Sequence, residues 1–459
     1  MKKQDDFHQK KNRNYCGILR KPPPVVGSMD TASRTISGIS AHMILDSRGN
    51  PTIETYCCIG DVCARASVPS GASTGSHEAV ELRDGGSRWG GKGVDEAILN
   101  VINPIRIAIA GMDVFEQEKI DQELCALAGI DKRILGANAT LGVSIACLRR
   151  AHQLNPGGPD TLYSSIRHLY RPSDMDNNIL PVPLINILNG GAHTSSNVDI
   201  QEFMIVPHGF DDFKEAVRAG VKVYHSLSSV LKEDGLLGGI GDEGGFAPNL
   251  PTNEHGLSYV LKAIEAAGYD PGKEISIALD CAAQEFFKDD LYHIDNRELT
   301  GLELSELYSE WLRKYPIISI EDPFGEDDWD SWIEFTNKEG DRVQIVGDDL
   351  YVTNPSRLQI GIENGASNAI LIKPNQIGTV TETLEVIRMA KQAGFATVIS
   401  HRSGETSDDF IADLAVGTNA GQIKTGAPAR SDRTSKYNQL LRIWAHIGDR
   451  ESTSYADLF

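Results

Sequence analysis

The sequence AILIKPNQIGTVTETLEVIRMAKQAGFATVISH occupies residues 369–401 and contains one strand–helix–strand unit. The apolar runs Ala369–Ile372 and Ala396–Ile399 are rich in isoleucine and valine, which is typical of strands buried on both faces. The residues between them have the length and periodicity of an amphipathic helix. A strand followed by a helix and a second strand predicts a parallel βαβ arrangement.

The helix within this stretch has recognisable ends. Thr379 with Glu382 predicts a capping box at its start, and Gly394 predicts its end. Its apolar stripe consists of Leu384, Ile387 and Ala390.

The same alternation extends from about Pro183 to the end of the chain. A helix is predicted around Phe213–Leu231 from the 3.6-residue spacing of its apolar positions. Further buried strands are predicted at Ile275–Leu279, Ile317–Ile320, Val343–Val346 and Gly421–Ile423. At least six strand–helix units of this kind favour an α/β fold built as a (β/α) barrel over an open sheet.

The N-terminal part has a different pattern, typical of a smaller α+β domain. Strands are predicted at Pro51–Gly60 and Val62–Pro69, and helices at Val94–Ile107 and Ala137–Arg150. The first residues are basic, contain three consecutive prolines and show no periodicity. We therefore divide the chain into a disordered extension at 1–37, an α+β domain at 38–170 and a barrel domain at 175–459.

Composition excludes several classes of function. The chain of 459 residues has a formal charge of −20, which argues against binding nucleic acid or an anionic membrane. It has no apolar run of the length that spans a bilayer. Seven scattered cysteines fit small buried apolar residues in a reducing cytoplasm.

A polar or charged residue follows each predicted barrel strand. In a barrel of parallel strands the carboxyl ends meet at one mouth, so these side chains should converge there. Six of them in register, with complementary chemistry, indicate an active site rather than unrelated strand ends. They are Asp280, Glu321, Asp348, Lys373, His401 and Lys424.

The residue types at this mouth predict a chemistry. Three converging carboxylates repel one another, and an all-oxygen set of this kind suits Mg²⁺. A lysine near another cation, a metal and a poorly solvated wall is expected to have its pKa lowered enough to act as a base. Arg402 and Ser403 offer a guanidinium and a hydroxyl for a phosphoryl group. Glu243, in a glycine-rich loop, and Glu202 are further acids, although Glu243 could belong to a simple acidic turn and Glu202 could be an ordinary strand charge. Together these groups suit removal of a proton next to a carboxylate, with metal stabilisation of the dianion.

Over about residues 39–443 the chain resembles the enolase family, and its Asn197–Gln201 segment resembles bacterial members. The motifs that carry the resemblance are numerous and in order. They are Asp46–Thr52, Ser70–Gly75, Glu81–Gly85, Leu135–Asn138, Asn189–Gly191, Gln201–Met204, Gly241–Asn249, Ser319–Pro323, Gly347–Leu350, Asn375–Thr379, Ser400–Thr406 and Lys424–Arg430.

The resemblance implies a fold, a reaction and a role for each matching residue. The fold is an α+β capping domain followed by a modified (β/α)8 barrel that opens with two strands and two helices. The reaction is the interconversion of 2-phosphoglycerate and phosphoenolpyruvate with two Mg²⁺ per active site. The implied catalytic residues are Lys373 as base, Glu243 as acid, Glu202 in support of that acid, Lys424 and His193.

The resemblance also implies the binding residues. Asp280, Glu321 and Asp348 hold the tighter Mg²⁺, and Ser73, on a loop that closes over the substrate, helps bind the second. The substrate contacts Gln201, His193, Glu202, Lys373, His401, Arg402, Ser403 and Lys424.

The family's members are commonly homodimers or larger, and Glu54 and Arg442 match positions that pair across the dimer interface. The sequence departs from the usual pattern at His42, Lys222, Gln284 and Trp444–His446. His42 and Trp444–His446 lie near the expected subunit contacts, so oligomeric state is the inference most weakened. Gln284 is expected near the metal, where it could alter the site slightly. Two alternatives remain open at this point. One is a paralogue acting on a related phosphorylated or phosphonylated acid, and the other is a non-catalytic surface-binding protein on the same fold.

Overall fold

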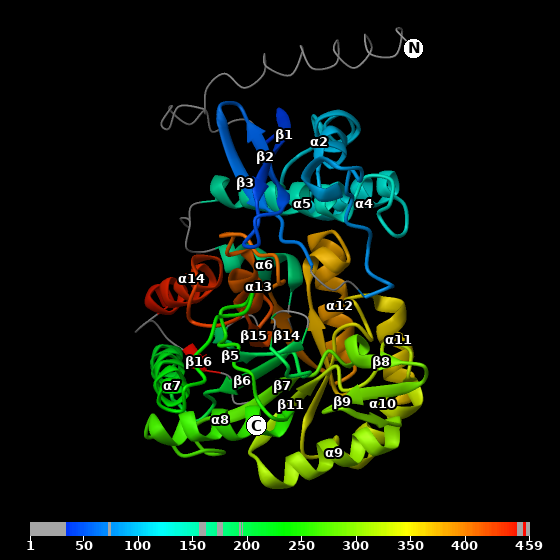
Figure 1. The fold of residues 1–459 in the computed structure, drawn as a ribbon. Helices are drawn as coiled ribbons and strands as arrows, with labels where there is room; N and C mark the ends of the chain where they lie inside the picture. Colours follow the sequence, from blue (N-terminus) through cyan, green and yellow to red (C-terminus); the bar gives the residue numbers. More distant parts are fainter. Residues whose placement is uncertain are drawn as a thin grey trace.

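The computed structural model describes residues 34–71, 75–155, 162–171, 178–191, 194, 196–447 and 453–455. Figure 1 shows a smaller N-terminal domain, in blue and cyan, seated on a larger barrel domain. The fold class expected from the sequence, an α+β capping domain followed by a barrel, is confirmed. Most of the extension predicted at 1–37 lies outside the described residues, as do Ser73 and His193.

The capping domain contains an antiparallel sheet packed on one long helix. The sheet has the order β1 (Gly38–Leu45), β2 (Pro51–Ile59), β3 (Val62–Ser67). Helix α5 (Ala137–Leu154) covers it and is buried along most of its length. Gly142 of α5 lies against Thr55 and Val68, where a Cβ atom would come within 2.6 Å of Thr55. A small residue is therefore required for this contact.

The helix predicted at Val94–Ile107 is interrupted. The structure has α2 (Asp95–Asn100), a π-helical turn η3 (Val101–Ile105) and α3 (Arg106–Ile109). Pro104 lies within the π turn, and because proline has no N–H to donate, the regular α-helical ladder cannot pass through it. The remaining helices of this region are η2 (Arg88–Gly91), α4 (Gln117–Ala128) and α6 (Leu162–Tyr170).

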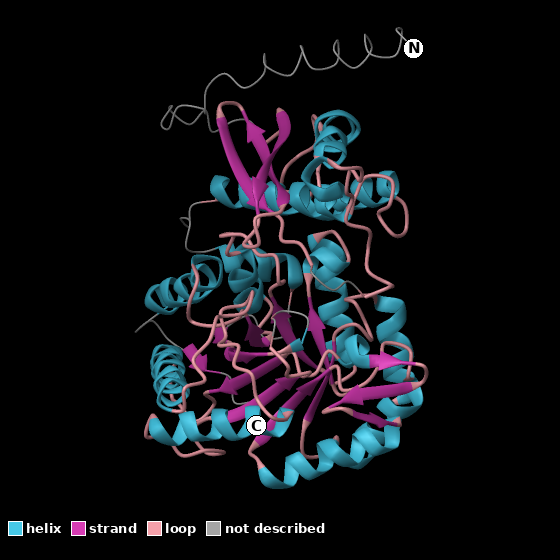
Figure 2. Cartoon of the chain, in the orientation of Figure 1, coloured by secondary structure: helices cyan, strands magenta, loops and turns pink. Residues whose placement is uncertain are grey.

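Eight strands close the barrel, and all six strands predicted from the apolar runs are present. Strand β6 is antiparallel to both of its neighbours, β5 and β7, so the strands do not all run in one direction. Figure 2 shows the strands inside a ring of helices. In spatial order they are β11 (Ile317–Glu321), β12 (Gln344–Gly347), β13 (Ala369–Ile372), β14 (Ala396–Ser400), β15 (Gly421–Lys424), β5 (Val182–Asn189), β6 (Glu202–Val206) and β7 (Ser276–Asp280).

The expected opening of two strands and two helices is also observed, because β5 and β6 precede α7 and α8. Apolar side chains from these strands, such as Leu184, Met204 and Leu371, fill the barrel interior. No helix in the described part of the chain has the length and apolar character needed to cross a membrane. The helices of this domain are α7 (Phe213–Glu233), α8 (Asn253–Ala266), α9 (Gly301–Lys314), α10 (Trp329–Glu339), α11 (Pro355–Asn364), α12 (Val380–Gln392), α13 (Phe410–Gly417) and α14 (Ser431–Ile447).

The short elements complete the described chain. They are η6 (Ala283–Phe286), β8 (Phe287–Lys288), β9 (Leu291–Ile294), β10 (Arg297–Leu299), η7 (Pro374–Gln376), and β4 (Asn178–Leu180) paired with β16 (Thr453–Tyr455).

The capping box predicted for α12 is half formed. The Thr379 hydroxyl accepts the Glu382 N–H at 3.2 Å, as expected for an N-cap. The Glu382 carboxylate does not return to the backbone of Thr379. It accepts the Thr379 hydroxyl at 2.6 Å and the Lys132 ammonium at 2.8 Å, so it joins α12 to the capping domain. Gly394, with φ of 82°, ends the helix as predicted.

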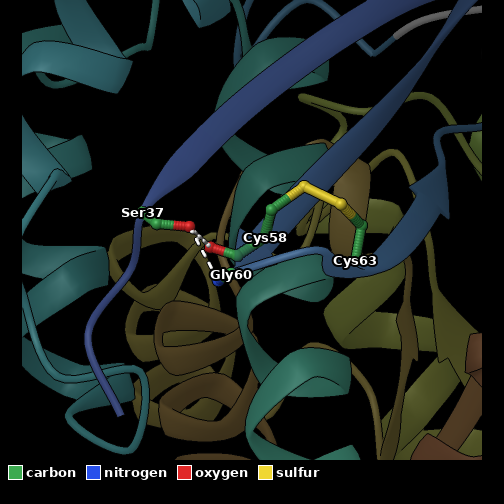
Figure 3. The surroundings of a disulfide bond; sticks show 4 residues. All are labelled: Ser37, Cys58, Gly60 and Cys63. Atoms are coloured by element: carbon green, nitrogen blue, oxygen red, sulfur yellow. Dashed lines mark hydrogen bonds between the residues drawn. A yellow bond between two sulfur atoms is a disulfide. The ribbon is translucent and has the colours of Figure 1, made fainter. Parts of the chain in front are cut away.

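Two expectations about the N-terminal region are corrected. Residues 34–37, which we assigned to the disordered extension, are held in the fold, since the Ser37 N–H donates to the Cys58 carbonyl at 2.9 Å. Cys58 and Cys63 are joined by a disulfide across the β2–β3 hairpin, whereas we expected every cysteine to be a thiol (Figure 3). Cys57, Cys147 and Cys281 are buried thiols, as expected.

The hairpin disulfide provides a prediction about stability. A bond that closes a loop this short should restrict the unfolded chain and stabilise the fold by about 2 kcal/mol. The double variant Cys58→Ser/Cys63→Ser should therefore lose that amount in urea unfolding without reductant, with Cys125→Ser as the free-thiol control. Dithiothreitol should lower the stability of the wild type to that of the double variant. A wild type equally stable with and without reductant would contradict the prediction.

A second prediction concerns Asp413, which joins three helices. Its carboxylate, on α13, accepts the Tyr163 N–H of α6 and the Gln439 amide of α14, both at 3.1 Å. Burial, followed by the nearby Asp409 charge, raises the pKa of Asp413 to about 8.

A raised carboxyl pKa means that stability is greatest below the unfolded value and is lost as pH rises towards 8. The Asp413→Asn variant mimics the protonated form. Its unfolding free energy, relative to wild type, should therefore increase between pH 5.5 and pH 8. The exposed substitution Asp341→Asn serves as the control, and a pH-independent difference for Asp413→Asn would refute the argument.

Candidate active site

A cavity opens at the mouth of the barrel, and almost all of its lining residues are polar or charged. Such a lining suits a small charged metabolite. It is lined by Gln201, Glu202, Glu243, Asp280, Ala282, Asp322, Asp348, Asp349, Lys373, Ser400, His401, Arg402, Ser403 and Lys424.

The structure therefore brings ten of the predicted site residues to one cavity. Glu321 is also buried here and contacts Lys424, whereas Ser73 and His193 lie outside the described residues. Strand geometry explains the convergence. Asp280, Glu321 and Lys424 end parallel strands, and Glu202 begins the antiparallel strand β6, so all four lie at the same rim.

Lys424 is the centre of the charge distribution. Its ammonium lies 2.7 Å from Asp280 Oδ2, 2.8 Å from Glu321 Oε1 and 3.1 Å from Glu202 Oε1. Burial by itself would lower the pKa of Lys424, but the surrounding carboxylates, led by Asp280, raise it well above its ordinary value. Lys424 is therefore a positive charge held among carboxylates.

The cavity contains more acids than its lysines can neutralise. Burial raises the pKa of Glu202 well above its usual range, with a further contribution from Glu243. Burial is also the main cause of the raised pKa of Glu321, and the Asp280 charge is the second cause. Glu321 Oε2 is buried and has no hydrogen-bond partner among the residues that the structure describes. Carboxylates in this condition take up a proton or a hard cation, and so the donor set fits Mg²⁺.

Lys373 pairs with one of the predicted metal ligands. Its ammonium forms an ion pair with Asp348. Burial lowers the pKa of Lys373, but the surrounding carboxylates, Asp348 first and then Glu321, together raise it above its ordinary value. The expectation of a lowered pKa assumed a metal ion beside the lysine, and it stays a prediction for the metal-bound site.

Asp322 and Asp349 were missed from the sequence. Asp322 accepts the backbone N–H groups of Asp348 and Asp349, both at 2.8 Å, and so fixes the turn that follows β12. One carboxylate oxygen from each of Asp322, Asp348 and Asp349 lies within 4.8 Å of the other two, close enough for the three to hold one cation. Burial and the Asp348 charge raise the pKa of Asp349 to about 8. The sequence did contain a signal for both residues. Asp322 directly follows Glu321 and Asp349 directly follows Asp348, and Glu321 and Asp348 are predicted metal ligands at strand ends.

His401 has a neighbour that the sequence did not indicate. Arg433, fully buried on α14, donates to His401 Nδ1 and to the carbonyl oxygens of Arg402 and Ser403. Burial and this guanidinium hold the pKa of His401 well below its ordinary value, so the ring is neutral. Since Nδ1 accepts a hydrogen bond, the ring proton is on Nε2, which lies 3.7 Å from Glu243 Oε1.

Two other residues missed from the sequence hold the predicted groups in place. Asn186 donates to Glu243 Oε2 at 3.1 Å. Glu78, from the capping domain, binds the guanidinium of Arg402 through both carboxylate oxygens. Their partners are more than 50 positions away in the chain, so local sequence gave no sign of either contact.

Of the departures from the family pattern, Gln284 was expected to affect the metal region. It accepts the Glu326 N–H at 3.0 Å and does not line the cavity. His42 faces Glu54 across the β1–β2 pair, with 3.3 Å between Nε2 and Oε1. The Lys222 ammonium lies over the ring of Tyr269.

Comparison with known proteins gives consistent matches for both domains. Residues 36–155 match the family described as "Enolase, N-terminal domain", and residues 177–457 match "Enolase, C-terminal TIM barrel domain". The chain is 53% identical over 418 residues to a protein of Beutenbergia cavernae named "Enolase", a match that covers 90% of this chain and 96% of that relative.

Proposed function

The chain belongs to the enolase family and is therefore a lyase, and from this premise we propose that it interconverts 2-phospho-D-glycerate and phosphoenolpyruvate with Mg²⁺, by the residues assigned below. The proposal depends above all on one observation. A lysine and a glutamate, Lys373 and Glu243, line the same small cavity as two further cations, Lys424 and Arg402. A proton acceptor, an acid and two anion-binding groups are what this dehydration requires.

Lys373 removes the C2 proton, and Glu243 assists loss of the C3 hydroxyl. Glu202 supports Glu243, since its raised pKa, caused by burial and then by Glu243, favours a shared proton between the two acids. His401 is neutral and directs Nε2 towards Glu243. His193 completes the expected catalytic set.

Substrate binding is assigned to the cations of the cavity. Lys424 neutralises the substrate carboxylate, and Arg402 with Ser403 binds the phosphoryl group. Gln201 lines the pocket beside Asp280, to which it donates at 3.0 Å.

Asp280, Glu321 and Asp348 would hold the tighter Mg²⁺, and Ser73 would contribute to the second. When bound, Mg²⁺ supplies positive charge for the carboxylate that becomes a dianion after proton removal. A cation on Asp348 would also compete with Lys373 for that carboxylate. Lys373 would then lose the interaction that raises its pKa.

We further propose a homodimer or a larger homo-oligomer in the cytoplasm, with no nucleic-acid or membrane partner. The charge of −20 supports the absence of polyanionic partners. The Cys58–Cys63 disulfide counts against the cytoplasm, because disulfides are rare in that compartment.

The proposed roles predict different effects for the two central substitutions. Lys373→Ala should lose both dehydration and exchange of the C2 proton with D₂O, each by about 10²–10⁴-fold, since the base serves both. Glu243→Gln should lose dehydration but keep C2 exchange, because Glu243 acts as the acid only after the C2 proton has been removed. Phosphoenolpyruvate formation is followed by ultraviolet absorbance, and exchange by NMR.

The controls for this experiment are the exposed substitution Lys338→Ala, which should behave as wild type, and a chelator, which should abolish turnover. A folded wild type that binds Mg²⁺ but does not turn over 2-phosphoglycerate would refute the glycolytic assignment. Activity on another phosphorylated acid would then identify a paralogue. If Lys373→Ala retained C2 exchange, only the assignment of Lys373 as the base would be refuted, and the proposed reaction would stand.

The oligomer proposal predicts an ion pair between Arg442 of one copy and Glu54 of another. The Arg442 side chain is 53% exposed, so it can reach a second chain. Arg442→Glu should shift the oligomer towards monomer in analytical ultracentrifugation, because two acids would then face each other. Arg88→Glu, at an exposed position of the capping domain, is the matched charge reversal. A fully dimeric Arg442→Glu protein would count against the pair.

A further inference from the structure

Glu78 links the capping domain to the barrel mouth. It lies in the short segment after β3, and the next residue, Ala79, donates its backbone N–H to the Gln376 carbonyl at 2.9 Å. The Glu78 side chain is only 8% exposed and faces Arg402, whose side chain is 3% exposed. A buried carboxylate from one domain thus meets a buried guanidinium from the other.

The contact between the two side chains is bidentate. Arg402 Nη1 lies 2.9 Å from Glu78 Oε2, and Nη2 lies 3.0 Å from Oε1. Asn375 Oδ1 accepts a further hydrogen bond from Nη1 at 3.0 Å. Two parallel N–H···O bonds fix the plane of a guanidinium as well as its position. Glu78 therefore determines which way Arg402 presents its group to the cavity.

The same carboxylate is connected to the acidic side of the cavity. Glu78 Oε1 also accepts the Gln376 amide at 3.3 Å, and that amide donates to Asp348 Oδ1 at 3.0 Å. Gln376 is held in turn by Thr353, whose hydroxyl donates to it at 2.7 Å. The network joins the capping segment, Arg402 and Asp348 through one buried side chain.

We propose that Glu78 is a positioning residue that orients Arg402 to bind the phosphoryl group of the substrate. This inference rests on the proposed function, in which Arg402 binds that group. Glu78 touches neither substrate nor reacting atoms, and it acts through Arg402. The capping domain thereby takes part in substrate affinity, and the site is incomplete without it.

A competing interpretation is that Glu78 occupies the place of the phosphoryl group and must leave before substrate binds. The two interpretations predict opposite effects of removing the charge. A positioning residue lowers KM by presenting Arg402 correctly, so its loss raises KM. A competitor raises KM, so its loss lowers it. The measurement of KM therefore decides between them.

The test is the kinetics of Glu78→Gln with 2-phosphoglycerate. A glutamine side chain at this position still accepts a hydrogen bond from Gln376, but it cannot form the bidentate, charge-assisted contact with Arg402. KM should rise about 10- to 100-fold, the range expected for loss of a charge-assisted contact, whereas kcat should change less than about threefold. Glu78→Asp, which keeps the charge on a shorter side chain, should recover part of the affinity.

Glu326→Gln is the matched control, because Glu326 also ties the capping segment to the barrel. It accepts the Ser76 N–H at 3.0 Å and the Ser76 hydroxyl at 2.6 Å, and the structure shows no contact between it and Arg402. This variant should keep the wild-type KM. An equal rise of KM in Glu326→Gln and Glu78→Gln would overturn the proposal. It would mean that substrate affinity depends on anchoring of the capping segment and not on the orientation of Arg402.

A double-variant cycle tests whether Glu78 acts through Arg402. In an Arg402→Lys background, where no guanidinium plane exists, adding Glu78→Gln should change KM less than about twofold. A further rise as large as in the wild-type background would overturn the proposal. So would a lowered or unchanged KM in the single variant.

A wild type without turnover would refute the proposed function instead. In that case the wild type and the two variants are compared by the rise in melting temperature that inorganic phosphate produces, a measurement that needs no turnover. Glu78→Gln should lose most of that rise and Glu326→Gln should keep it. An equal rise in wild type and Glu78→Gln would overturn the role of Glu78.

Discussion

The Lys424 ammonium holds Glu202, Asp280 and Glu321 within 3.1 Å, at a position where burial alone would make each carboxylate costly to ionise. Isolated buried charges cost several kcal/mol each, and the shared ammonium offsets part of that cost. The arrangement requires four strand ends to meet at one rim. Closure of the barrel around its apolar interior meets that requirement, and the reversed direction of β6 brings Glu202 to the same rim.

The surplus of negative charge that remains has a functional consequence. The raised pKa of Glu202 and of Glu321, caused first by burial, means that the site favours the uptake of protons or cations. Lys373 shows the same dependence on its surroundings, because its pairing with Asp348 sets its basicity. Acid–base properties here belong to the cluster and not to single residues.

The capping domain completes the site through buried polar contacts. Arg149 forms an ion pair with Asp408 at 2.6 Å, and Lys132 forms one with Glu382 at 2.8 Å, so the two domains are joined at two further points. Glu78 adds a contact to the cavity itself. These pairs fix the orientation of the domains as well as adding stability, because each leaves a buried charge unpaired if the domains shift.

The barrel strands and the strand-end groups, such as Asp280 and Lys373, were determined by the sequence itself. Short apolar runs with a polar residue at the end carry their own local signal of burial and direction. The tertiary structure alone decided the disulfide of the β2–β3 hairpin, the contacts of Arg433 and Glu78, and the raised pKa of Lys373. Hydrogen bonds and electrostatic interactions between side chains depend on distances between groups far apart in the chain, and only folding sets those distances.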